Sequence, residues 1–120
     1  MKYGNDGGTG RAVSTLAALA NNHRLRVYRL LVEAGPQGLN AGTIASRLGL
    51  QPSSLTFHLQ HLQRAGLVTQ IRQSRERIYA ADFPVMGWLV DYLTENCCTS
   101  SRECRAPRSR ERRGKAQRVA

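Results

Sequence analysis

The chain has 120 residues, of which 41% are hydrophobic, and this fits one domain with a modest core. Its 18 Lys and Arg residues against 8 Asp and Glu residues give a net charge of +10, which favours an anionic partner such as nucleic acid. No apolar run reaches the roughly 18 residues of a membrane span. Residues 1–10 also lack the apolar stretch of a secretory signal, so we expect a cytoplasmic protein.

Composition divides the chain into three parts. Residues 1–10 contain four glycines and no apolar periodicity, and are predicted to form a flexible arm. Residues 11–95 show the apolar periodicity of a folded domain. Residues 96–120 carry eight basic and two acidic side chains together with all three cysteines. This basic tail either contacts DNA or serves only solubility.

Two helices are predicted in the first third of the domain from apolar residues at helical spacing. The first covers residues 11–20, and its apolar stripe consists of Val13, Leu16, Ala17 and Ala20. The second begins with Asn22 as its cap and ends before Gly35 and Pro36. Its inward positions are expected to be Leu25, Tyr28, Leu31 and Val32.

Two further helices have the spacing of a helix-turn-helix. Asn40 is predicted to cap a helix over residues 41–48, which Gly49 ends. Pro52 then begins a helix that reaches residue 65, because proline suits the first turn of a helix. The inward positions of this second helix are Leu55, Leu59 and Leu62. Two short helices joined by a tight turn that contains glycine are typical of a DNA-binding helix-turn-helix.

A hairpin and a last helix complete the domain. Residues 67–72 and 77–81 are predicted strands, and the polar residues 73–76 form the tip between them. Asp82 is expected to cap a final helix with Pro84 in its first turn. The order of four helices, a hairpin and a helix is typical of a mainly α, winged helix-turn-helix fold.

The outward face of the helix over residues 52–65 is the first candidate binding surface. At 100° per residue, the positions opposite or flanking the core stripe are Ser53, Thr56, Phe57, Gln60, His61 and Arg64. Such side chains reach base edges and phosphates in the major groove, although a solvated polar face would show the same pattern. Phe57 favours a binding role, because a phenyl ring opposite the core has no burial partner within the domain.

The hairpin tip and the histidines are further candidates. Arg72, Arg75 and Arg77 suit contact with phosphates or the minor groove, and the alternative is an ordinary solvated tip. The histidines lack the spacing of metal ligands. We expect His58 to be half-buried and hydrogen-bonded, and His61 to lie near phosphate.

The region from Gly38 to Val68 and the charged hairpin after it resemble the ArsR/SmtB family of bacterial metalloregulatory repressors. The motif lies in His58, Leu59, Leu62, Ala65, Gly66, Leu67 and Val68, with Thr56 in place of a family serine. The resemblance covers about residues 12–95. It implies a homodimer held by its first and last helices, which binds a two-fold operator and leaves it when an inducer binds.

The resemblance also implies residue roles. The family's base-reading positions fall on Ser53, Ser54, Thr56 and Phe57, with Gln60 and His61 nearby. Arginine is the commoner residue where this chain has Phe57, so the family's operator preference does not carry over.

The inducer site departs from the family's commonest patterns. The helix over residues 41–48 has no cysteine, and Asp91 lacks the histidine that a zinc site of the last helix needs. What remains is Cys97, Cys98 and Cys104, a C-C-x5-C pattern that resembles the arsenic-responsive branch with a C-terminal cysteine cluster. Thiolates select soft ions, and As(III) or Sb(III) takes three sulfur ligands, whereas zinc usually takes four.

Three functions remain open. The first is a repressor of arsenical-resistance genes that carries no permanent cofactor and responds to As(III) or Sb(III). The second is a thiol-redox-responsive repressor of the same fold, because exposed low-pKa cysteines oxidise readily. The third, a small thiol enzyme, lacks a C-x-x-C motif and any paired acid and base, so we do not expect an enzyme.

Overall fold

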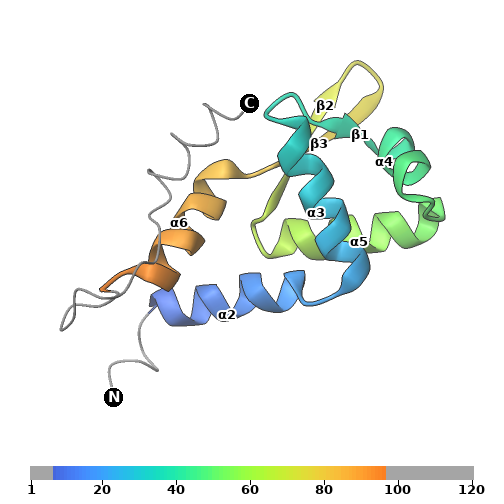
Figure 1. Ribbon diagram of the computed structural model, residues 1–120. Helices are drawn as coiled ribbons and strands as arrows, with labels where there is room; N and C mark the ends of the chain where they lie inside the picture. The colour runs from blue at the N-terminus through green and yellow to red at the C-terminus, as the bar shows by residue number, and fades with distance from the viewer. Residues whose placement is uncertain (1–6, 97–120) are drawn as a thin grey trace, which may run out of the picture. The chain divides into compact units, whose positions relative to one another are not determined.

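The computed structural model describes residues 7–96 and confirms the predicted winged helix-turn-helix (Figure 1). Within these residues no helix has the length and apolar character needed to cross a membrane. The elements in chain order are α2 (Gly7–Leu19), α3 (Asn22–Ala34), β1 (Leu39–Asn40), α4 (Ala41–Leu48), α5 (Pro52–Arg64), β2 (Val68–Gln73), β3 (Glu76–Ala81) and α6 (Phe83–Thr94).

The described residues fall into two units, which divide between Val85 and Met86. The first unit contains the elements from α2 to β3 and the start of α6, and the second contains the rest of α6. In the second unit the rings of Trp88 and Tyr92 stack with their centroids 5.4 Å apart. The Thr94 hydroxyl donates a hydrogen bond to the Val90 carbonyl at 2.9 Å, as threonine commonly does within a helix.

Both of the first two helices begin earlier than the sequence analysis predicts. Asn21, not Asn22, caps α3, because Asn21 has an extended backbone and its Oδ1 accepts the amides of His23 and Arg24 at 2.9 and 3.1 Å. Helix α2 starts at Gly7, so the predicted boundary of the flexible arm at residue 10 is wrong. Glycine costs a helix only about 1 kcal/mol per residue, and the Ala- and Leu-rich run that follows outweighs this cost.

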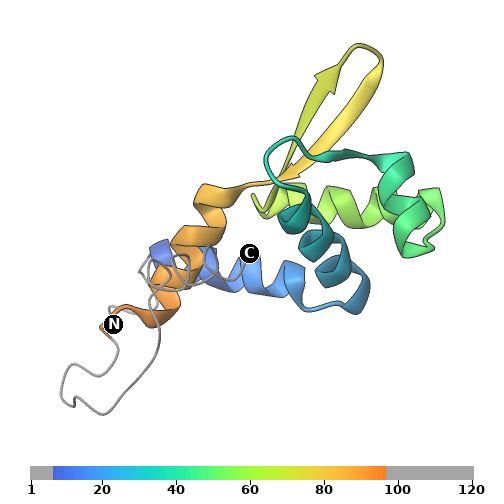
Figure 2. The ribbon, with the colours of Figure 1, turned by 45° about the horizontal axis from the view of Figure 1, so that its top comes forward.

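The sheet has a strand that the sequence analysis did not predict. Strand β1 pairs with β3, and β3 pairs with β2, all antiparallel. The β2–β3 hairpin, here called the wing, extends away from α3, α4 and α5 (Figure 2). Its turn contains only Ser74 and Arg75, not the four predicted residues, and Ser74 has the left-handed φ of 56° that a tight turn requires.

The core of the first unit lies where α3, α4, α5 and the sheet meet. The predicted stripe of α5 is confirmed, since Leu55, Leu59 and Leu62 are at most 1% exposed. Asp82 also caps α6 as predicted, because its Oδ1 accepts the amide of Val85 at 3.1 Å. One of the inward positions predicted for α3 is wrong. Leu25 is 44% exposed, and Val27 is fully buried in its place.

Helix α2 carries small or apolar side chains on two faces. The predicted stripe lies on the face that is exposed to solvent. Ala12, Thr15 and Ala18 are the buried residues, in the part of the chain where α2 packs on α3 and α5. The Thr15 hydroxyl is satisfied by the Ala12 carbonyl at 2.9 Å, which allows a polar residue to be buried. Val13 and Leu16, expected to face inward, are 60% and 41% exposed.

Candidate nucleic-acid interface

Local signals fix the geometry of the helix-turn-helix formed by α4 and α5. Asn40 caps α4 as predicted, and its Oδ1 accepts the amide of Thr43 at 2.8 Å. Gly49 ends α4 in the left-handed conformation, with φ 66° and ψ 36°, and its amide donates to the Ala45 carbonyl. Pro52 then opens α5, which packs against α4. The turn therefore presents one side of α5 to solvent.

The predicted base-reading face of α5 is on the surface. Ser53, Ser54, Thr56, Phe57, Gln60 and Arg64 are exposed, and His61 is half-buried. Phe57 is 53% exposed and contacts its helix neighbour His61 edge-on, with the ring centroids 4.6 Å apart. The Thr56 hydroxyl donates to the Pro52 carbonyl at 3.0 Å, so it is left as an acceptor. This face combines hydrogen-bonding groups with one accessible ring.

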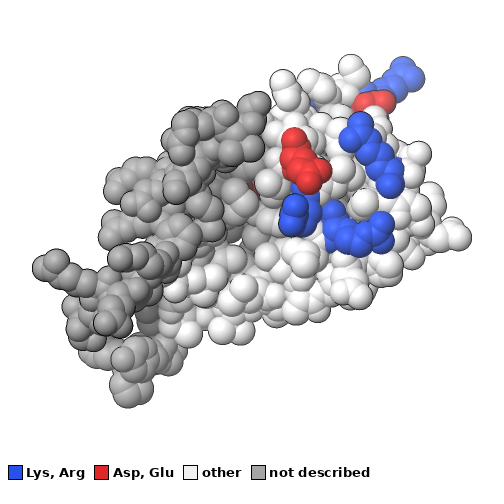
Figure 3. All heavy atoms as spheres, viewed as in Figure 1, with Lys and Arg blue, Asp and Glu red and all other residues white. Residues whose placement is uncertain are grey.

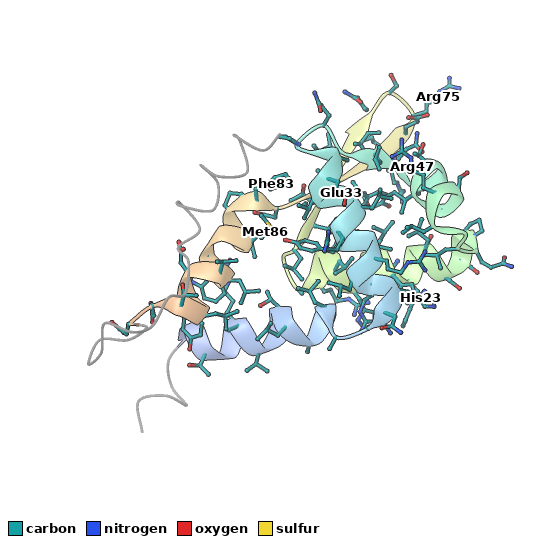
Figure 4. The ribbon with its side chains drawn as sticks, viewed as in Figure 1. His23, Glu33, Arg47, Arg75, Phe83 and Met86 are labelled. Atoms are coloured by element: carbon teal, nitrogen blue, oxygen red, sulfur yellow. The ribbon has the colours of Figure 1, made fainter. Side chains whose placement is uncertain are left out.

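His58 differs from its prediction. It is buried, 8% exposed, and its Nδ1 is buried without a hydrogen-bond partner among the described residues. The centroid of its ring lies 5.5 Å from that of His23, which is at the start of α3 (Figure 4). Burial, and then the nearby Arg24, His23 and His61, lower the pKa of His58 below its usual 6.5. His58 is therefore a neutral core residue at neutral pH.

We expect acid to destabilise the domain through His58. Because its pKa is lower in the folded chain, the unfolded chain binds this proton first, so the free energy of unfolding falls as the pH falls below about 6.5. His58→Phe keeps a ring and removes the titration, and it should flatten this dependence in urea denaturation at pH 5 to 7 (roughly). His61→Phe serves as the control and should change the pH dependence far less, because His61 is the smallest of the causes that lower the pKa of His58. An unchanged pH slope in His58→Phe would contradict the assignment.

The wing holds two arginines directly opposite each other. Arg72 pairs with Arg77 in the β2–β3 register, and like charges at such positions destabilise a sheet. Glu76, the nearest acidic residue in sequence, instead accepts a hydrogen bond from the Asn40 amide at 3.5 Å. Arg75 lies at the tip of the wing (Figure 4), and among residues 7–96 none of these three arginines forms an ion pair with a carboxylate. An anion would relieve this repulsion.

Basic side chains also lie outside α5 and the wing. Figure 3 shows Arg side chains over α3, α4 and the wing on one face of the described part. The sequence analysis missed Arg24 of α3, whose guanidinium Nε donates to the Ala18 carbonyl at 2.7 Å and which lines a pocket with His61 and Arg64. No sequence signal marks Arg24, because its neighbours on α5 are about 40 residues away.

Cys97, Cys98 and Cys104, the predicted metalloid ligands, lie outside the described residues. Within residues 7–96, no group of three His, Cys, Asp or Glu side chains is placed to hold a metal ion. Asp91 of α6 accordingly belongs to no such group.

Comparison with known proteins identifies the family. A family model described as a helix-turn-helix domain matches residues 19–71. The transcriptional activator HlyU of Vibrio cholerae is 30% identical over 91 residues, which cover 76% of this chain and 82% of HlyU. Residues 19–71, which the family model matches, include α3, α4, α5 and part of the wing.

Solved structures agree. The structure described as reduced HlyU from Vibrio cholerae N16961 has a TM-score of 0.61 at 28% identity, and the match covers 82% of this chain and 99% of that one. An ArsR-like transcriptional regulator from Rhodococcus shares the fold, with a TM-score of 0.63 at 23% identity and 92% and 93% coverage. These relatives are transcriptional regulators and not enzymes. The chain thus belongs to the ArsR/SmtB family of winged helix-turn-helix transcriptional regulators.

Proposed function

We propose that this regulator binds operator DNA as a homodimer in the cytoplasm, and that trivalent arsenic or antimony bound by Cys97, Cys98 and Cys104 releases it and derepresses arsenical-resistance genes. The proposal of this inducer rests on the C-C-x5-C pattern. The pattern begins three residues after Thr94, the last residue of α6. Three thiolates suit the pyramidal coordination of As(III). Arg102 and Arg105 flank Cys104 and favour its thiolate form.

DNA binding is supported by α5 and the wing. The exposed face of α5 carries Phe57 and Gln60 among hydroxyl side chains, and it suits the edges of bases in the major groove. The unpaired arginines of the wing, Arg72 and Arg77, suit the phosphates beside that groove. Winged helix-turn-helix proteins place these two elements on one duplex.

A second copy of the chain would cover the outer face of α2. Val13 and Leu16 are 60% and 41% exposed, and Ala17 and Ala20 beside them are also exposed. Apolar side chains gathered on one face of a short helix favour contact with another protein surface. A dimer would also place two α5 helices on half-sites about one DNA turn apart. Ligand binding just after α6 would change this separation.

The experiment uses a duplex that the protein itself selects from a random pool, with anisotropy read at fixed salt and with reductant present. Arsenite should raise the operator Kd about 5- to 150-fold, the range of typical coupling energies, and the effect should saturate near one arsenite per subunit. Replacing all three cysteines by serine should leave DNA binding intact and abolish the response. Cys97→Ser and Cys104→Ser test the two ends of the cluster. Operator binding that arsenite and antimonite do not change would overturn the proposed inducer.

Thiol oxidation is the second candidate signal. The relative's structure is described as the reduced form of HlyU, and clustered thiolates oxidise readily to disulfides or sulfenic acids. In the same assay without reductant, peroxide should then release DNA and dithiothreitol should restore binding. A protein that responds to peroxide and not to arsenite is a redox regulator of the same fold.

A further inference from the structure

A basic pocket lies beside the recognition helix in the first unit. It is open to solvent and has a volume of about 440 Å³ between α2, the start of α3 and the end of α5. Its polar lining comes from Ser14, Arg24, His61 and Arg64, and the rest is alanine. No acidic residue lines the pocket. The donors therefore come from two consecutive helices, α2 and α3, and from α5, which is distant from both in sequence and which the fold brings beside them.

Arg24 is held in place within this pocket. Its Nε donates to the Ala18 carbonyl at 2.7 Å, so the guanidinium has a fixed position and its terminal N–H groups remain available. Across the described residues, neither Arg24 nor Arg64 forms an ion pair with a carboxylate. The amides at the start of α3 are already used by the Asn21 cap, so side chains have to supply the contacts to any ligand here.

The electrostatic field near the pocket is positive. His58 is 8% exposed and adjoins this region, and after burial the nearby Arg24, His23 and His61 each lower its pKa. Arg24 and Arg64 line one open pocket that has no carboxylate in its lining, so a bound anion would reduce the repulsion between the two guanidinium groups.

We propose that Arg24, His61 and Arg64 form a phosphate-binding site, with the Ser14 hydroxyl as an additional donor. Arginine and lysine contacts to phosphate position a protein on a duplex. His61 also touches Phe57 on the predicted base-reading face, so the pocket borders the surface assigned to DNA. A backbone phosphate of the operator is one source of the ligand, and a free phosphate group is the other. The first source rests on the proposed DNA binding.

The test compares matched charge removals in the full chain. Arg24→Gln and Arg64→Gln remove one pocket charge each, and Arg29→Gln removes one charge from the surface of α3, where Arg29 pairs with Glu33 at 3.8 Å. For a DNA phosphate, each pocket variant should weaken operator binding about fivefold near 0.15 M salt and reduce the salt slope by about 1. Arg29→Gln should leave the slope unchanged. Arg64 is exposed, so Arg64→Gln folds even if Arg24→Gln does not.

Inorganic phosphate provides the second arm. It is titrated against chloride at constant ionic strength without DNA, while the imidazole signals of His61 are followed by NMR. Shifts that saturate in the native chain and vanish in Arg24→Gln, with an unchanged DNA salt slope, would assign the site to a free phosphate group. An unchanged slope and no saturable shift would overturn the proposal. Arsenite is absent throughout, so this outcome is separate from failure of the cysteine-based response.

Discussion

Replacing Gly38 by alanine is expected to cost about 3 kcal/mol or more of folding stability. Gly38 has a φ of +69°, and an added Cβ would overlap the carbonyl oxygen of Tyr79 and lie 2.9 Å from its carbonyl carbon. These are backbone atoms of β3, so no side-chain rotation relieves the overlap. The strand β1 would have to separate from β3 and lose the pairing of Leu39 with Tyr79.

The free energies of unfolding of Gly38→Ala and Gly49→Ala, measured by urea denaturation, separate the cost of the steric overlap from the cost of a positive φ. Gly49 also has a positive φ, of +66°, but nothing lies within 4 Å of its added Cβ. Gly49→Ala should therefore cost only about 1 kcal/mol, the usual penalty of the left-handed conformation. Equal losses in the two variants would mean that Gly38 does not approach the Tyr79 carbonyl closely enough for an added Cβ to overlap it.

Removing the opposed arginines of the wing should weaken operator binding without weakening the fold. Each phosphate contact contributes a salt slope of about 0.9, so the double variant Arg72→Gln/Arg77→Gln should raise the Kd on the order of thirtyfold near 0.15 M salt. The slope of log K against log salt should fall by about 2. Because Arg72 and Arg77 repel each other across β2 and β3, the free energy of unfolding should stay constant or rise by a few tenths of a kcal/mol (roughly).

The control removes the same two charges from the exposed surface of α3. Arg26→Gln/Arg29→Gln matches the change in net charge while leaving the wing intact. If both double variants lose the same affinity and slope, the wing acts only through the overall charge of the protein. Thermal unfolding of both variants checks that neither loss reflects a damaged fold.

Much of the candidate interface could be predicted from sequence, because its determinants are local. The outward face of α5 follows from the spacing of Leu55, Leu59 and Leu62, and the turn before it from Gly49 and Pro52. The charge of the wing is equally visible. That Arg72 faces Arg77 also follows from the hairpin, because residues 72 and 77 flank both the predicted four-residue tip and the observed two-residue turn.

The sequence alone determined α3, α4, α5 and α6 and the caps of α3, α4 and α6 within a residue, since these depend on neighbours within four positions along the chain. It also showed the hairpin and the candidate thiolate cluster as short motifs, but it placed the start of α2 four residues late. The tertiary structure decided which face of α2 is buried, because Ala12 and Val13 both suit an inner surface. It also decided the pairing of β1 with β3 and the meeting of Arg24 with Arg64. These contacts join segments about 40 residues apart, and only the packing of α3 on α5 and β3 brings them together.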